Sequence, residues 1–159
     1  MRYRELAARL DASYVGMYVP AIRAPSLQGD SVLIGEPGEG ERQMLLVFDT
    51  RCPYSRASLR SWNALAERLA GDSGVSIYGI CLDSLEASRS YAMERALAFS
   101  VVSLTERRAQ GLFHLRRVPQ TLILDDEGRV VFTRLGVLES EASLDSIVAA
   151  TRDTSSLLP

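Results

Sequence analysis

A cysteine that follows an apolar run is the residue of this sequence best placed to do chemistry. Met44–Phe48 has the character of a buried strand, and three residues separate it from Cys52-Pro53-Tyr54-Ser55. Pro53 suits the first position of a helix, because the N–H that it lacks would have no partner there. Backbone N–H groups and the helix dipole at such a position both favour a thiolate. We therefore expect Cys52 to act as a nucleophile.

The elements around this cysteine are predicted to form a strand–helix–strand unit. Apolar residues recur at helical spacing between Leu59 and Leu69, so the helix that Pro53 opens should end near Gly71. A second apolar run, Val75–Leu82, contains several β-branched residues and predicts the next strand. Since such crossovers are right-handed, the two strands should be parallel.

The rest of the chain predicts a mixed sheet with helices on both faces. Pro and Gly punctuate short strand-like pieces such as Ser31–Ile34, which indicates an N-terminal hairpin. The later expected elements are a helix from Ser84 to about Leu97, a shorter helix over Glu106–Phe113, strands over Thr121–Leu124 and Val130–Leu135, and a helix from Ser140. The expected order behind the hairpin is β-α-β-α-β-β-α, an α/β fold.

The length and the net charge of the chain argue against some classes of protein. The 159 residues suit one domain, and the formal net charge of −2 argues against a nucleic-acid partner. No apolar run reaches the roughly 18 residues of a membrane span, and no signal peptide is expected. We divide the chain into an N-terminal segment, 1–18, which is a short surface helix or the remnant of a linker or anchor, a domain over 19–152, and a tail over 153–159.

Two motifs together carry a family resemblance. Cys52-Pro53-Tyr54-Ser55 opens a helix, and Val118-Pro119-Gln120-Thr121 opens a later strand. This combination resembles the thioredoxin superfamily. The N-terminal hairpin, the long crossover and the Leu-Asp-Asp-Glu-Gly-Arg turn make the chain most similar to TlpA- and ResA-type thiol:disulfide oxidoreductases, or redoxins. The resemblance covers about 19–152 and implies a thioredoxin fold, with a central mixed β-sheet flanked by helices and an N-terminal β-hairpin extension.

The resemblance also implies roles for residues. Cys52 corresponds to the thiol that attacks disulfides, and Pro119 corresponds to a cis-proline that sits against it. Val118 would then offer its backbone to an extended substrate chain, as an added strand does. The substrate-binding surface is expected to include Arg51, Pro53 and Tyr54 as well.

Ser55 stands where this family has its resolving cysteine. Because a serine cannot release a mixed disulfide, we expect single-cysteine thiol-disulfide exchange with protein or glutathione disulfides, in which mixed disulfides persist. Ser55 is expected to donate a hydrogen bond to the Cys52 thiolate. The Cys-Pro-Tyr segment is also similar to the glutaredoxin active site, so glutathione is the expected co-substrate, with no other cofactor. Alternatively, Ser55 replaces a cysteine of the natural sequence.

The arginines near Cys52, the second cysteine and the single histidine each allow two interpretations. Arg51 stands where relatives usually have Trp; with Arg56 and Arg60 it either makes the site electropositive or is simply solvated. Cys81 is expected to be buried and inert, the alternative being a resolving thiol. His114 is the only histidine, so we expect a surface or packing role and no metal site.

Two other functions remain as alternatives. One is a redoxin-fold binding module or assembly factor without turnover. The other is a peroxiredoxin-like peroxidase, which the sequence disfavours because Asp49 occupies the place of the expected Thr. The resemblance further implies a location outside the cytoplasm, in the periplasm or a similar compartment, with a membrane anchor; a cytoplasmic location is the alternative. We also expect a monomer.

Overall fold

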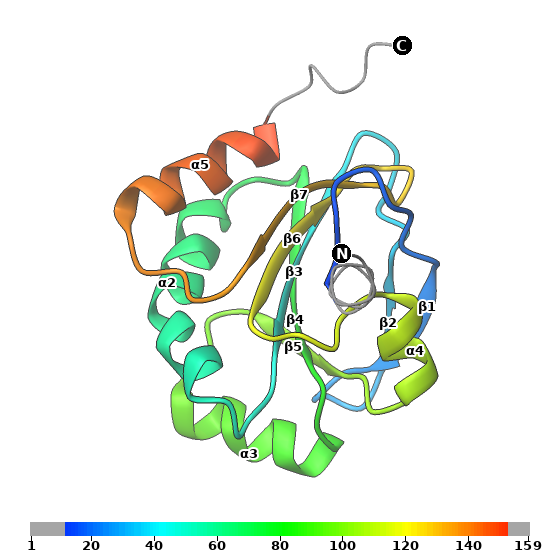
Figure 1. Ribbon diagram of the computed structural model, residues 1–159, viewed down its shortest axis with the longest axis vertical. Helices are drawn as coiled ribbons and strands as arrows, with labels where there is room; N and C mark the ends of the chain where they lie inside the picture. Colours follow the sequence, from blue (N-terminus) through cyan, green and yellow to red (C-terminus); the bar gives the residue numbers. More distant parts are fainter. Residues whose placement is uncertain (1–11, 153–159) are drawn as a thin grey trace, which may run out of the picture.

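The computed structural model describes residues 12–152 and is built on two β-sheets (Figure 1). Strands β1 (Ile22–Pro25) and β2 (Ser31–Ile34) form a two-stranded antiparallel sheet. The five-stranded sheet has the order β5-β4-β3-β6-β7, and its strands are β3 (Arg42–Phe48), β4 (Val75–Cys81), β5 (Ser100–Ser103), β6 (Gln120–Leu124) and β7 (Val130–Leu135). Strands β3, β4 and β5 are parallel, whereas β6 and β7 are antiparallel to their neighbours. The predicted mixed sheet and N-terminal hairpin are confirmed.

The two faces of the large sheet are covered by different elements. Helices α2 (Pro53–Leu69), α3 (Leu85–Arg95) and α5 (Glu141–Arg152) pack on one face, and the β1–β2 hairpin and α4 (Arg107–Leu112) lie on the other (Figure 1). Alternate residues of β3 supply the two cores, because successive side chains of a strand point to opposite faces. Leu46 packs with the α2 side and Leu45 with the hairpin side.

Strand β3 is the centre of both cores, since all seven of its residues are buried. On the α2 side, Phe48 stacks on Tyr91 of α3 at 5.6 Å between ring centroids. Trp62 of α2 is fully buried, and its Nε1 donates a hydrogen bond to Thr121 Oγ1 at 2.9 Å. Burial of each such large side chain contributes roughly 1.5–3 kcal/mol, so α2 is held firmly against the sheet.

Strand β5 is an element that the sequence analysis missed. Its four residues, Ser100–Ser103, pair in parallel with Tyr78 to Cys81 of β4. A strand this short shows no useful periodicity, and it follows closely on α3. That helix ends at Arg95, earlier than the predicted Leu97, because Ala96 takes a left-handed conformation with φ of 48° that stops it.

The predicted start of α3 is confirmed in atomic detail. Ser84 Oγ accepts a hydrogen bond from Ala87 N at 3.2 Å, which is the N-cap interaction expected of a serine there. Residues 1–11 of the expected N-terminal surface helix and the tail over 153–159 lie outside the described residues; residues 12–18 are described and contain no helix. Within 12–152, no helix combines the length and apolar character needed to cross a lipid bilayer.

Candidate functional site

Cys52 lies at the N-terminus of α2, in the N-cap position. Its backbone is extended, with φ of −85° and ψ of 117°, and Pro53 is the first helical residue. Cys52 N donates to Asp49 O at 3.2 Å, and Cys52 O accepts from Arg56 N at the same distance. Cys52 is half-buried and forms no disulfide. The backbone therefore holds a free, partly exposed cysteine at the helix end.

Asp83, which comes shortly after β4, accepts hydrogen bonds from the loop that joins β3 to Cys52. Thr50 N donates to Asp83 Oδ2 at 2.9 Å, and the Thr50 hydroxyl donates to the same oxygen. Burial alone raises the pKa of Asp83, but these two hydrogen bonds, the neighbouring Asp49 side chain and the charge of Arg51 outweigh burial and lower it. Asp83 is thus held as a carboxylate beside the loop. The available signal for this role was the place of Asp83 just after the second predicted strand.

Arg51 is partly neutralised by two carboxylates. Its guanidinium lies 3.7 Å from Asp49 Oδ1 and 3.8 Å from Asp83 Oδ1, while 84% of its side chain is exposed. Asp49 Oδ1 also accepts a hydrogen bond from Arg51 N at 2.8 Å. Arg51 therefore stands next to Cys52 with its charge shared between these partners, and Arg56 and Arg60 are exposed along α2.

Ser55 and Tyr54 differ sharply in exposure. Ser55 is fully buried, and its Oγ accepts a hydrogen bond from Asp49 N at 3.4 Å. Among the residues that the structure describes, no hydrogen bond joins Ser55 to Cys52; the serine instead helps to close the turn before the helix. Tyr54 is 65% exposed, which leaves a large aromatic surface beside the thiol.

Pro119 lies at the same edge of the sheet as Cys52. The Val118–Pro119 peptide bond is cis; Pro119 is buried and Val118 is half-buried. The residue after this proline, Gln120, pairs with Val47 of β3, so the proline is next to the end of the strand that leads to Cys52. Tertiary structure thus brings the two sequence motifs to one edge.

Gln120 is a site-positioning residue that the sequence analysis did not identify. It is fully buried, and its Nε2 donates to His114 O at 3.0 Å and to Arg117 O at 2.7 Å. Its Oε1 accepts hydrogen bonds from Ser13 N at 3.1 Å and Ser13 Oγ at 2.8 Å. The amide therefore fixes the loop before Pro119 and attaches the N-terminal segment to it. A polar residue at the start of an otherwise apolar strand was the available signal.

The second cysteine is buried in the core, and the single histidine makes an aromatic contact. Cys81 has no exposed surface and packs in the α2-side core, where burial raises the pKa of its thiol. This confirms the expectation that Cys81 is buried; its inertness stays a prediction. The His114 ring is half-buried and meets the edge of the Tyr14 ring at 5.8 Å, a packing contact. In residues 12–152, no group of three or more His, Cys, Asp or Glu side chains is arranged to hold a metal ion.

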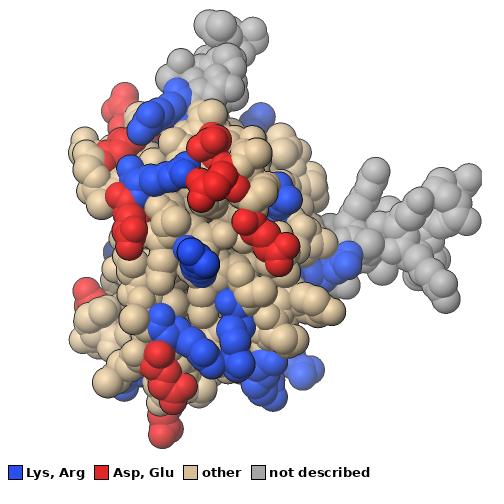
Figure 2. Space-filling view, turned by 90° about the vertical axis from the view of Figure 1, so that its left-hand side faces the viewer, with Lys and Arg blue, Asp and Glu red and all other residues tan. Residues whose placement is uncertain are grey.

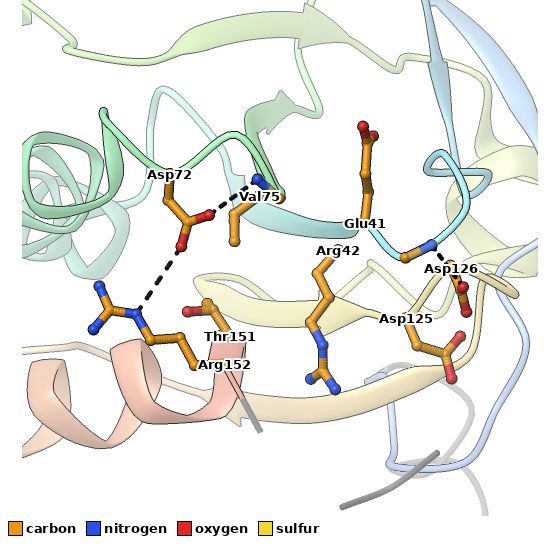
Figure 3. A pocket seen from close by; sticks show the side chains of 10 residues that line it. Glu41, Arg42, Asp72, Val75, Asp125, Asp126, Thr151 and Arg152 are labelled. Carbon is orange, nitrogen blue, oxygen red and sulfur yellow. Dashed lines mark hydrogen bonds and ion pairs between the residues drawn. The ribbon is translucent and has the colours of Figure 1, made fainter. Parts of the chain in front are cut away.

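A charged hollow of about 250 Å³ lies at the opposite edge of the sheet (Figure 3). Its polar groups stabilise the fold itself. Arg42 Nη1 donates to Ala150 O at 2.7 Å, Asp126 Oδ2 accepts from Gly40 N at 2.9 Å, and Asp72 faces Arg152. The candidate site is therefore the Cys52 edge.

The family of the chain follows from a match that spans most of its length. Residues 15–133 match the AhpC/TSA family. The chain belongs to the AhpC/TSA family. No sequence among curated proteins matches it. This membership and the fold confirm the resemblance to thioredoxin-like redoxins, and the family supports the thiol-disulfide oxidoreductase class.

Solved structures with the same fold include several redox proteins. StoA from Bacillus subtilis is 15% identical with a TM-score of 0.69, and covers 84% of this chain and 97% of its own. The Chlorobium tepidum protein described as thiol:disulfide interchange protein DsbE is 19% identical with a TM-score of 0.74, and covers 88% and 99%. A peroxiredoxin-like protein from Aquifex aeolicus is 15% identical with a TM-score of 0.68, and covers 87% and 88%. At these identities the likeness is one of fold.

Proposed function

We propose that this protein is a thiol-disulfide oxidoreductase that works through one nucleophilic cysteine, Cys52. The observation that carries the proposal is the half-buried, free thiol at the N-cap of α2, on the sheet edge that also holds Val118 and Pro119. Helix N-termini stabilise thiolates, and an accessible thiolate is the species that attacks disulfides. Tyr54 and Arg51, both exposed, border the substrate surface.

The reaction has two exchange steps. The Cys52 thiolate attacks one sulfur of a substrate disulfide, a mixed disulfide forms, and the other substrate sulfur leaves as a thiolate. Ser55 has no thiol, and Cys81 has no exposed surface, so neither is placed to resolve this intermediate. An external thiol must do so by attacking the mixed disulfide and releasing the Cys52 thiolate. Glutathione is the proposed co-substrate for that step.

Incubation with oxidised glutathione tests the nucleophile. We expect intact-mass analysis between about pH 6 and 9 to show one glutathionyl group on Cys52, a range that brackets lowered and ordinary thiol pKa values. The Cys52→Ser variant should gain no group, and the Cys81→Ser variant should behave as the wild type. An unmodified Cys52 over the whole range would contradict the proposal.

Restoring a second thiol tests the single-cysteine step. In a Ser55→Cys variant, the new thiol should attack the mixed disulfide within the same molecule, so the glutathionylated species should be replaced by a disulfide between residues 52 and 55. Ser55→Ala is the matched control, because it changes the same buried position without adding a thiol. A mixed disulfide that persists equally in both variants would argue against this account of resolution.

Reduction of a peroxide is a second candidate, favoured by the fold shared with the peroxiredoxin-like protein from Aquifex aeolicus. Against it, Asp49 occupies the place of the expected Thr, and the hydroxyl of Thr50 is engaged by Asp83. Assays of hydrogen peroxide consumption and insulin reduction, each with glutathione, separate the candidates. Oxidoreductase activity predicts insulin reduction, a peroxidase predicts peroxide consumption, and a binding module predicts neither.

We further propose that the natural protein acts on protein disulfides outside the cytoplasm, as a monomer held by a membrane anchor. Support comes from the fold shared with proteins described as thiol:disulfide interchange proteins and from the resemblance to TlpA-type redoxins. Fractionation of the natural host with an antibody against this domain tests the location. Recovery in the soluble cytoplasmic fraction would contradict it, and light scattering of the purified protein tests the monomer.

A further inference from the structure

A groove runs along the outer face of α2 beside α3, on the face shown in Figure 2. Its volume is about 530 Å³, and the residues that argue for a ligand are Arg56, Arg60, Asn63, Glu67 and Arg95. Leu59 and Ala64 supply an apolar part of the lining. The groove begins close to the thiol, because Arg56 N is bonded to the carbonyl of Cys52 at 3.2 Å.

The three arginines of this groove lack acidic partners. Arg56, Arg60 and Arg95 are exposed, and in the part of the chain that the structure describes none of them forms an ion pair with a carboxylate. Arg68, two turns further along α2, is different: it contacts Glu141 at 2.6 Å and Asp145 at 2.8 Å. In Figure 2 several basic side chains gather low on this face, with acidic side chains beside and below them, and basic and acidic side chains interleave higher up. With three arginines and one glutamate in its lining, the groove has a net positive charge.

Contacts beneath the groove hold it in shape. Asn63 Nδ2 donates to Ala96 O at 3.3 Å, and Asn63 Oδ1 accepts from Ala98 N at 2.8 Å, which ties α2 to the end of α3. The Arg95 guanidinium lies over the Tyr91 ring, 5.8 Å from its centroid. The Tyr91 hydroxyl forms no hydrogen bond of normal geometry among the described residues, but burial raises its pKa and the nearby charges of Arg95 and Arg56 offset part of that rise, so both guanidinium groups face this ring. Such a preformed groove binds a ligand without a large ordering cost.

The dimensions and charge of the groove identify one class of occupant. From Arg56 to Glu67 the helix rises by about 16 Å, at roughly 1.5 Å per residue. About five residues of an extended peptide span that length. Three guanidinium groups against one carboxylate, Glu67, favour a negatively charged ligand. We propose that the groove between α2 and α3 binds an extended acidic segment of a polypeptide partner.

The groove ends one helical turn from Cys52, so a segment bound there leads the same partner chain to the thiol. Identification of that partner as the disulfide substrate rests on the function proposed above. Binding of the acidic segment itself does not, because none of the groove residues takes part in the exchange of disulfides.

Fluorescence anisotropy with peptides that contain no cysteine tests the binding. The probe is a fluorescein-labelled hexapeptide of Asp, Glu and Leu, and its control is the same peptide with Asn and Gln. We expect the acidic peptide to bind more tightly, with an affinity that falls as salt is added. An exposed Arg–carboxylate pair contributes about a twofold effect, so the triple variant Arg56→Gln, Arg60→Gln, Arg95→Gln should weaken binding roughly tenfold.

A matched variant on the same helix tests whether binding depends on the three groove arginines or on any positive charge of α2. Arg68→Gln also removes one positive charge from α2, but its guanidinium is paired with Glu141 and Asp145, so the affinity should stay within twofold of the wild type. The proposal is overturned if the triple variant binds as well as the wild type, or if Arg68→Gln weakens binding as much as the triple variant. Competition by succinate at an equal concentration of charge would also overturn it, because this would indicate a small-anion site.

A second set of peptides separates this proposal from the redox function. Each carries a mixed disulfide with nitrothiobenzoate, preceded by the acidic or the amide sequence, and released chromophore reports attack by Cys52. We expect faster attack on the acidic peptide, with the difference lost in the triple arginine variant. Equal rates for both peptides would contradict the proposed acidic-peptide groove, but not the proposed oxidoreductase function. If the acidic peptide binds tightly but Cys52 attacks neither peptide, the oxidoreductase function is contradicted and the binding proposal is not.

Discussion

Replacement of Asp83 by Asn isolates the charge that braces the Cys52 loop. The side chain keeps its size, and an amide oxygen can still accept from Thr50 N and from the Thr50 hydroxyl. A hydrogen bond to a charged group contributes about 1.5–3 kcal/mol, and a neutral one about 0.5–1.5 kcal/mol, so two weakened bonds cost about 2 kcal/mol. Loss of the pair with Arg51 adds little, because the Arg51 side chain is 84% exposed.

The substitution also removes the free-energy cost of burying a charge, because the Asp83 side chain is only 15% exposed. This offsets part of the loss. We therefore expect Asp83→Asn to lower the free energy of unfolding by about 1–2 kcal/mol at pH 7, as measured by urea denaturation. The control is Asp145→Asn, which removes the same charge from a side chain that is 71% exposed. It should change the free energy of unfolding by less than about 0.5 kcal/mol.

The direction of the Asp83 pKa shift also predicts how the stability difference between the wild type and Asp83→Asn changes with pH. The folded-state pKa of Asp83 is lowered, so its contribution to stability is present above the pKa of the unfolded chain, near 4, and is lost as the pH falls through the lower folded-state pKa. The difference in unfolding free energy between the wild type and Asp83→Asn should be constant from about pH 5 to 8 and shrink below about pH 4. Equal stability at pH 7, or a difference that grows in acid, would refute the reasoning.

Four other substitutions or modifications test particular contacts. Gln120→Leu removes hydrogen bonds to two backbone carbonyls and to Ser13, and should lower the free energy of unfolding by about 2–4 kcal/mol in urea denaturation. Trp62→Phe leaves the buried Thr121 hydroxyl without its donor and should cost about 2–3 kcal/mol by the same assay. Tyr91→Phe removes a buried hydroxyl that has no hydrogen-bond partner among the described residues, so the thermal midpoint should stay unchanged or rise; a clear fall would reveal a contact. Iodoacetamide should alkylate Cys52 in the native protein and Cys81 only after unfolding, as read by peptide mass spectrometry.

Local sequence patterns predicted those elements whose residues carry strong periodicity or capping signals. Strand β7 has the predicted bounds, and the start of α2 at Pro53 agrees as well. Strand β5 was missed because four residues at an edge of the sheet are stabilised mainly by pairing with β4, which is a contact distant in sequence. The extent of α3 was overestimated because a left-handed alanine, rather than a glycine, ends it.

The amino-acid sequence by itself determined the fold class and the place of Cys52, the proposed nucleophile, at the start of a helix. These depend on hydrophobic periodicity, on a proline with a fixed φ and on a cysteine, all of which act over a few residues. Only the tertiary structure decided what surrounds the thiol: the Asp83 brace, the bond of Ser55 to the Asp49 backbone, and the Gln120 amide behind Pro119. It also decided that Arg68 is paired while Arg56 and Arg95 share an open groove. Hydrogen bonds and ion pairs act over a few ångströms, so their partners depend on which strands and helices the sheet brings together.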